Sequence, residues 1–174
     1  MALYAERPGT DAPVSSLHAA PSRRGRNLAD RHRRPARGRW PHNVRGTTIL
    51  SIQSSVACGH VGNSAATFPL MRLGVEVLPV LTVHFSNHTG YGAWRGPLLA
   101  ASDVGEVILG IDERGALESV DAVLSGYQGA EAVGAEILKA VALVKQRNPE
   151  AIYCCDPVMG DVGRGFYVRP GIPE

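Results

Sequence analysis

Cysteines are scarce in this sequence, and long apolar runs are absent from it. The three cysteines, Cys58, Cys154 and Cys155, are odd in number and two are adjacent, so they fit neither a disulfide framework nor a metal-site spacing. We expect reduced thiols in a cytoplasmic protein, with Cys154 and Cys155 as small buried hydrophobic residues. No window holds the roughly 20 uninterrupted apolar residues of a membrane-spanning helix, so a membrane is not an expected partner.

Three common signatures of catalytic sites are also missing. The sequence has no GxxxxGK phosphate loop and no GxGxxG between a strand and a helix, and Gly59 and Gly62 have the wrong spacing for either motif. It has no GxSxG nucleophile elbow, so Ser54 is not supported as a hydrolase nucleophile.

Lysine is absent from the first 46 residues, and the charge divides the chain there. Residues 1–46 carry ten arginines and three acidic residues, a net charge of +7, whereas residues 47–174 carry eight basic and thirteen acidic residues, a net charge of −5. The first segment lacks hydrophobic periodicity, so we predict a disordered extension. We favour a non-native extension over an organellar transit peptide or a tail that contacts nucleic-acid phosphates, and nucleic acid is not an expected partner.

Residues 47–174 alternate between strand-like and helix-like segments. Apolar, β-branched runs predict buried strands at 48–53, 75–85, 120–124 and 151–155. Amphipathic runs between them predict helices at about 64–73, 102–117 and 131–147. This alternation predicts right-handed crossovers and a mostly parallel α/β sheet that is incomplete at its C-terminal end.

The helix ends carry local signals. Asn63 and Ser64 are suited to cap the first helix and Ser102 the second, because their side-chain oxygens accept hydrogen bonds from free N–H groups. Pro69 should kink the first helix or end its first half. The residues from Gly165 onward are expected to start a hairpin. Four apolar residues of the second helix are expected on its buried face: Val104, Val107, Ile108 and Ile111.

Polar residues follow the predicted strands at the sheet edge where ligands of open α/β folds bind. Ser54 follows the first strand, the Ser125–Tyr127 turn the third and Asp156 the fourth, while the loop after the second strand adds His88 and Thr89. These residues predict a small-molecule site linked to phosphate, in which Asp156 is suited to hold Mg²⁺ or an alkali cation. Each residue also has a purely structural explanation, as a turn former, a core aromatic or a loop surface residue.

Four segments together resemble the pyridoxal kinases of the ribokinase-like superfamily: ILSIQSSVACGHVGNSAATFPLMRLG, TVHFSNHTGYGAWRG, DAVLSGYQG and YCCDPVMGD. The resemblance runs from about Thr48 to Pro170. It implies a ribokinase-like, mostly parallel sheet with flanking helices, and residues 47–174 would be the N-terminal part of that kinase domain. It also implies ATP-dependent phosphorylation of the 5′-hydroxymethyl of pyridoxal, pyridoxine or pyridoxamine, with ATP, Mg²⁺ and a candidate monovalent cation, in a homodimer.

The resemblance implies roles for individual residues. Ser54 would hydrogen-bond the pyridine ring, Tyr127 would pack on it, and Asp156 would lie at the nucleotide and metal site. The other implied substrate-binding residues are Val61, Phe85, His88, Thr89 and Gly90. Ser55 stands where the family commonly has histidine.

The catalytic base that the resemblance implies is not found. The family's catalytic aspartate lies in a GxGD motif, nothing after Asp161 matches that motif, and the resemblance therefore places the base beyond Glu174. We accordingly expect a truncated form without the catalytic base. The alternatives are an inactive B6-binding fragment or pseudo-kinase, and the related hydroxymethylpyrimidine kinase, against which the SNHTGYG and SGYQG segments argue.

Overall fold

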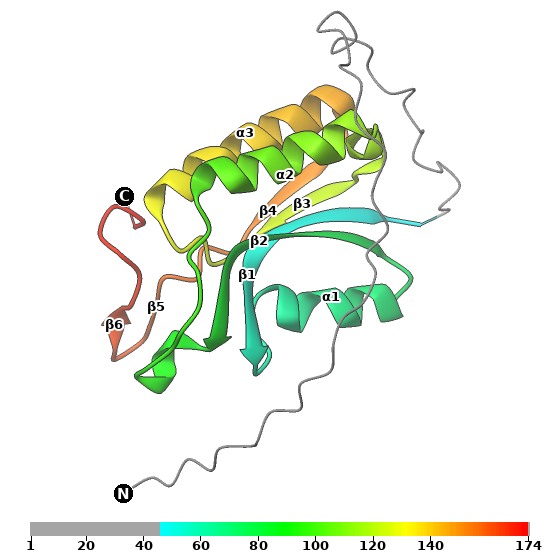
Figure 1. Ribbon diagram of the computed structural model, residues 1–174. Coiled ribbons are helices and arrows are strands. Elements are labelled where there is room, and N and C mark those ends of the chain that lie inside the picture. The colour runs from blue at the N-terminus through cyan, green and yellow to red at the C-terminus, as the bar shows by residue number, and fades with distance from the viewer. Residues whose placement is uncertain (1–45, 174) are drawn as a thin grey trace, which may run out of the picture. The chain divides into compact units, whose positions relative to one another are not determined.

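The computed structural model describes residues 46–173, so the prediction of an arginine-rich extension over residues 1–46 lies outside the described residues except at Gly46. Four strands form one sheet in the order β2-β1-β3-β4, and each neighbouring pair runs parallel (Figure 1). Their bounds are β1 Thr48–Cys58, β2 Glu76–Asn87, β3 Ala122–Ser125 and β4 Ile152–Cys155. An antiparallel hairpin joins β5 Gly160–Asp161 to β6 Gly165–Phe166, and so begins earlier than predicted. The parallel sheet confirms the predicted α/β fold.

Helices and short 3₁₀ turns connect the strands: α1 Asn63–Arg72, η2 Thr89–Tyr91, α2 Ala101–Glu113, η3 Ala116–Ser119 and α3 Glu131–Arg147. Helices α2 and α3 lie side by side on one face of the sheet and α1 lies on the other (Figure 1). Helix α3 has the predicted bounds. The positive charges of Lys145 and Arg147 in its last turn interact favourably with the negative end of the helix dipole. None of the helices among residues 46–173 has the length and apolar character that crossing a membrane requires.

The main core lies between the sheet and the layer formed by α2 and α3. Its buried residues include Leu50, Ile52, Val80 and Val123 from the strands and Val104, Ile108, Val133, Ile137 and Val144 from the helices. Complete burial of one such side chain contributes about 1.5–3 kcal/mol. Packing in this layer therefore stabilises the sheet and the positions at which its strands end. Val107 was predicted on the buried face, but it is 51% exposed because Val104 and Ile108 define the buried stripe of α2.

Strand β1 is longer than predicted. It continues past Gln53 to Cys58, and its register against β2 shifts between Gln53 and Ser55. Ser54 therefore lies inside an irregularity of the strand and not at its end, which corrects the sequence prediction. A second buried cluster that contains Val56 and Phe85 keeps the two strands paired beyond this point. Such irregularities bend a strand and change the direction of its side chains.

The predicted caps of α1 and α2 are wrong. The N-cap of α1 is Gly62, and Asn63 is buried with its side chain directed to the sheet. The Ser64 hydroxyl donates to the Val56 carbonyl at 2.8 Å, so it ties the helix to β1 without capping it. The N-cap of α2 is Ala100, which makes no side-chain cap hydrogen bond, and Ser102 is already inside the helix. The polar side chains of α1 are used for tertiary contacts.

Two further expectations need correction. Helix α1 continues through Pro69 to Arg72, so the alternative that the proline ends the first half of the helix is wrong, while the alternative of a kink stays a prediction. Cys154 and Cys155 are exposed, whereas burial was predicted. They lie on β4, which among residues 46–173 pairs only with β3 and has an open edge.

Candidate functional site

A cavity of about 230 Å³ opens where the four parallel strands give way to their loops. Seven of the predicted site residues line it: Ser54, Val61, Phe85, His88, Thr89, Tyr127 and Asp156. Gly90, and Ser125 and Gly126 of the turn after the third strand, do not line it. The structure also places residues there that the sequence did not single out: Gln53, Val56, Gly62, Val83, Asn87, Val158 and Tyr167. The side chains predicted from separate segments thus share one cavity, while their chemical roles stay predictions.

Ser54 is held against the start of α1. Its residue is 5% exposed, and Gly62, with φ of +54°, lies directly on it. A Cβ atom at Gly62 would overlap the carbonyl oxygen and Oγ of Ser54, so only glycine fits. No hydrogen bond of the Ser54 hydroxyl is found within residues 46–173, and Ser54 is among the residues that line the cavity. It is therefore available to a ligand.

A buried polar network fixes the strand that carries Ser54. The Ser51 hydroxyl donates to Asn63 Oδ1 at 2.7 Å and accepts from Gln53 Nε2 at 2.8 Å. Asn63 Nδ2 lies 3.1 Å from the Val80 carbonyl oxygen on β2 and also reaches two β1 carbonyls. Because buried polar groups are costly when unpaired, this network specifies how β1, β2 and α1 meet.

The loop after β2 returns along the edge of the sheet. The Ser86 amide donates to the Arg95 carbonyl at 2.7 Å and the His84 amide to the Pro97 carbonyl at 3.0 Å. Between these ends the chain forms η2, which contains Thr89. The returning segment covers the edge of β2, and the first residues of the loop, His88 and Thr89, lie at the cavity.

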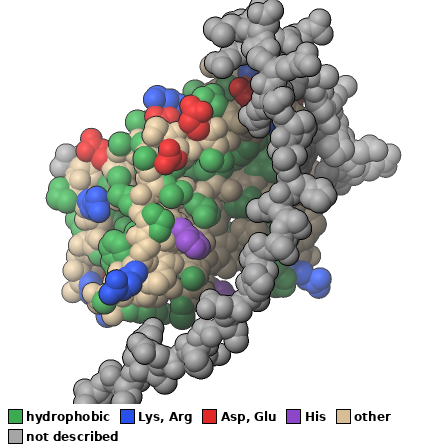
Figure 2. Space-filling view, viewed as in Figure 1, with side chains coloured by type: hydrophobic (Ala, Val, Ile, Leu, Met, Phe, Trp, Pro, Cys, Tyr) green, Lys and Arg blue, Asp and Glu red, His purple; other side chains and the backbone are tan. Residues whose placement is uncertain are grey.

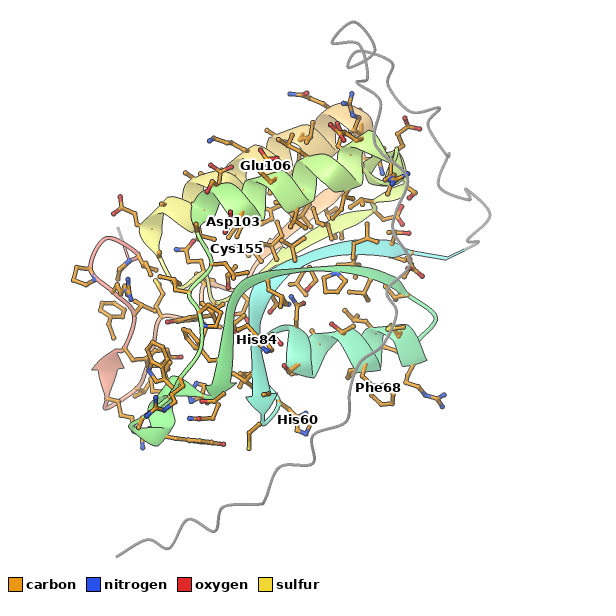
Figure 3. All side chains as sticks on the ribbon, in the orientation of Figure 1. His60, Phe68, His84, Asp103, Glu106 and Cys155 are labelled. Carbon is orange, nitrogen blue, oxygen red and sulfur yellow. The ribbon has the colours of Figure 1, made fainter. Side chains whose placement is uncertain are left out.

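His88 caps η2 through its ring. Its Nδ1 accepts a hydrogen bond from the Gly90 amide at 3.1 Å, so Gly90 supports the site without lining the cavity. An Nδ1 that accepts a hydrogen bond leaves Nε2 as the ring nitrogen that can donate one. The ring packs edge-on against Tyr91 and Tyr167, with centroid distances of 6.0 and 6.2 Å. His60 and His84, by contrast, are exposed and do not line the cavity (Figure 3).

Two tyrosines, Tyr127 and Tyr167, also line the cavity. The Tyr127 carbonyl accepts a hydrogen bond from the Thr82 hydroxyl at 2.7 Å, which fixes the turn after β3. Burial raises the pKa of the Tyr127 phenol, and the positive charge of Arg169 lowers it in part. Burial also raises the pKa of Tyr167, which the negative charges of Asp161 and Asp156 raise further. Both phenols are therefore neutral hydrogen-bond donors at ordinary pH.

Asp156 places a carboxylate at the rim of the cavity. Its amide donates to the Ser125 carbonyl at 2.9 Å, which extends the pairing of β3 with β4 as far as this residue. Asp156 and Asp161 both act electrostatically on Tyr167, and of these two carboxylates only that of Asp156 belongs to a residue that lines the cavity. Residues 46–173 contain no cluster of three or more His, Cys, Asp or Glu side chains that could hold a metal. One carboxylate beside phosphate oxygens nevertheless fits Mg²⁺, which keeps several waters as ligands.

Other acidic side chains lie away from the cavity. Figure 2 shows acidic side chains over the helical layer, and Figure 3 places Asp103 and Glu106 there on α2. Neither residue lines the cavity. The missed site residues lacked clear local signals: Gly62 is one glycine of a loop, Asn87 lies within SNHTGYG, and Tyr167 follows a short hairpin.

No family model matches the chain. Curated relatives do match it: the chain is 70% identical over 129 residues to a pyridoxal kinase of Rubrobacter xylanophilus and 68% identical over 126 residues to one of Leifsonia xyli. These matches cover 74% and 72% of this chain and 44% of each relative. The chain thus spans less than half the length of the curated relatives it matches.

Solved structures share the arrangement of strands and helices. The pyridoxal kinase of Leishmania donovani in complex with ADP and pyridoxamine matches with a TM-score of 0.69 and 34% identity, over 72% of this chain and 44% of that one. The pyridoxal kinase of Entamoeba histolytica with PLP matches with a TM-score of 0.68 and 26% identity, over 73% and 46%. The described residues therefore have the ribokinase-like α/β fold. Within that class, the aligned stretch is similar to pyridoxal kinases.

Proposed function

We propose that this chain supplies the vitamer-binding part of a pyridoxal kinase. The whole protein would transfer phosphate from ATP to the 5′-hydroxymethyl group of pyridoxal, pyridoxine or pyridoxamine. The observation that supports this most is the shared cavity of Ser54, Thr89, Tyr127 and Asp156, in a stretch 70% identical to a pyridoxal kinase. That identity also favours pyridoxal kinase over the related hydroxymethylpyrimidine kinase.

In this proposal the cavity orients the pyridine ring. The Ser54 hydroxyl, which has no partner among residues 46–173, hydrogen-bonds the ring. Tyr127 packs on the ring, and Phe85 and Val61 exclude water from its edge. His88 and Thr89 close the remaining side, and the Gly90 amide supports them through its hydrogen bond to the His88 ring. Catalysis of phosphoryl transfer depends mostly on such positioning and on electrostatic stabilisation.

The proposal gives Asp156 the nucleotide side of the cavity. Its carboxylate would hold Mg²⁺ together with the phosphates of ATP, and a monovalent cation is a further candidate there. When bound, Mg²⁺ neutralises charge on the transferring phosphate. The family's base, which accepts the proton of the substrate hydroxyl, lies in a GxGD motif, and these 174 residues contain no such motif.

The organisation of the whole protein is also proposed. Residues 47–174 would belong to the kinase domain and residues 1–46 to an extension outside it, as the charge division supports. The free cysteines found among residues 46–173 suit the cytoplasm, whose reducing conditions keep thiols reduced. A homodimer is proposed on the family resemblance alone.

The test separates binding from transfer. Pyridoxine is titrated into the 174-residue chain by calorimetry, with Ser54→Ala and Ser55→Ala compared. Ser55 is the matched control, because its hydroxyl bonds Ser64 and does not line the cavity. We expect saturable binding that Ser54→Ala weakens by about 3- to 10-fold, the loss of one neutral hydrogen bond, and that Ser55→Ala leaves within about twofold.

Activity is measured separately, as formation of pyridoxal 5′-phosphate from pyridoxal, ATP and Mg²⁺. We expect none from these 174 residues. Formation of pyridoxal 5′-phosphate by these 174 residues would disprove the claim that the catalytic base is missing. The absence of vitamer binding would disprove the proposed site.

A further inference from the structure

Asn87, the last residue of β2, joins the two ends of the loop that follows it. Its Nδ2 donates to the His88 carbonyl at 3.0 Å and to the Ala93 carbonyl at 2.9 Å. Its Oδ1 accepts from the Ser86 hydroxyl at 2.7 Å. The amide thus uses both of its N–H groups to close the loop and its oxygen to hold its own orientation.

The loop has few other ties to the rest of the protein. Its remaining hydrogen bonds within the described part of the chain are internal, from Tyr91 and Gly92 amides to the carbonyls of His88 and Thr89, and from the Gly90 amide to the His88 ring. Tyr91 at its tip is 71% exposed. The side chain of Asn87 is therefore what connects the loop's first residue to its last.

This loop carries two residues of the cavity. His88 and Thr89 line it, and Asn87 itself lines it from the end of β2. Just outside the loop, Phe85 and Trp94 stack with ring centroids 4.1 Å apart, which holds the two stems together. The stems are thus fixed by this stacking and by the hydrogen bonds between Ser86 and Arg95, and the path between them is closed by the Asn87 amide.

We propose that Asn87 is a positioning residue that holds His88 and Thr89 against the bound vitamer by closing the 88–93 loop. The role in ligand binding rests on the proposed function, whereas the closing of the loop does not. Replacement of the amide by a carboxylate of the same size removes both donors and sets a negative charge against two carbonyl oxygens.

The experiment compares Asn87→Asp with Asn148→Asp in the full 174-residue chain. Asn148 is a matched control, since it is half-buried too and its Nδ2 donates to the Val120 carbonyl at 2.9 Å, far from the cavity. Limited chymotrypsin digestion measures cleavage after Tyr91 by mass spectrometry, and calorimetry measures the Kd for pyridoxine. Thermal unfolding of each variant reports global stability.

For Asn87→Asp we expect cleavage after Tyr91 to accelerate at least about fivefold and the Kd to rise by a similar factor. Asn148→Asp should change neither, even where it lowers the Tm as much. Asn87→Gln keeps both donors and should recover part of the protection. Saturating pyridoxine should slow cleavage of the wild-type loop.

Equal cleavage after Tyr91 in wild type and Asn87→Asp would overturn the proposal. Faster cleavage with an unchanged Kd would overturn the positioning role and leave a structural one. If the wild type bound no pyridoxine, the proposed function would fail, while cleavage would still decide whether Asn87 closes the loop.

Discussion

At the scale of single residues, Ser54 depends on a glycine eight positions further along the chain. Gly62 has a positive φ and packs directly against the carbonyl and hydroxyl of Ser54. The start of α1 and the irregular part of β1 are therefore too close for a side chain between them. A side chain at residue 62 has to displace one of them. The hydroxyl proposed to hold the ring is thus positioned by the absence of a side chain.

Gly62→Ala should therefore lower the free energy of unfolding by about 3 kcal/mol or more, because backbone strain and overpacking add. Gly115→Ala is the control: Gly115 also has a left-handed φ, of +74°, but nothing lies within 4 Å of its Cβ position. That variant should cost about 1 kcal/mol. Urea unfolding measures both. Equal losses would show that contact with Ser54 contributes nothing.

The Tyr127 phenol should make the free energy of unfolding depend on pH in the alkaline range. Burial disfavours the ionised phenol, so the folded-state pKa lies above the unfolded value of 10.0. The folded state therefore keeps its proton after the unfolded state loses it. This contribution is fully present below pH 10.0 and is lost as the pH rises through the folded pKa.

Urea unfolding from about pH 8 to about pH 11 tests this dependence. The free energy of unfolding should fall less steeply above about pH 10 in Tyr127→Phe than in the wild type. Tyr91→Phe, at an exposed tyrosine, should follow the wild type. Parallel curves for Tyr127→Phe and the wild type would contradict the effect of burial.

At the scale of elements, local patterns predicted the helices better than the strand that carries the site. Helix α3 has its predicted bounds because periodicity and terminal charge are local signals. The extension of β1 to Cys58 depends on pairing with β2 across the register shift, which no window of the β1 sequence contains. The predicted cap at Asn63 failed because buried carbonyls on both strands take its amide.

The site shows the same division. Ser54, Thr89 and Asp156 could be predicted because each follows a predicted strand and lies in a motif of the resembled family, and the structure brings them to one cavity. Gly62 and Asn87 could not, since their importance comes from what they touch after folding. Tyr167 reaches the cavity only through the path of the chain after β6.

At the scale of the whole molecule, the two edges of the sheet differ. The outer edge of β2 is covered by its own returning segment, including an antiparallel bridge between Val83 and Leu98. Strand β4 pairs with β3 alone among residues 46–173, and its Ile152 is 64% exposed. An unprotected strand edge with apolar side chains is a template for pairing with another chain.

These 174 residues should therefore self-associate through β4 when they are produced as such. Sedimentation velocity should show a sedimentation coefficient that rises with concentration, and Ile152→Lys should suppress the rise because a charge at a strand edge opposes pairing. Leu138→Lys is the matched control. Leu138 is also 64% exposed, but it lies on helix α3, which has no open strand edge with unpaired backbone groups. If exposed apolar area alone caused association, both lysines would suppress it equally. Suppression by Ile152→Lys alone assigns the contact to the backbone edge of β4, which is also the edge at which any further strand of the sheet would have to pair.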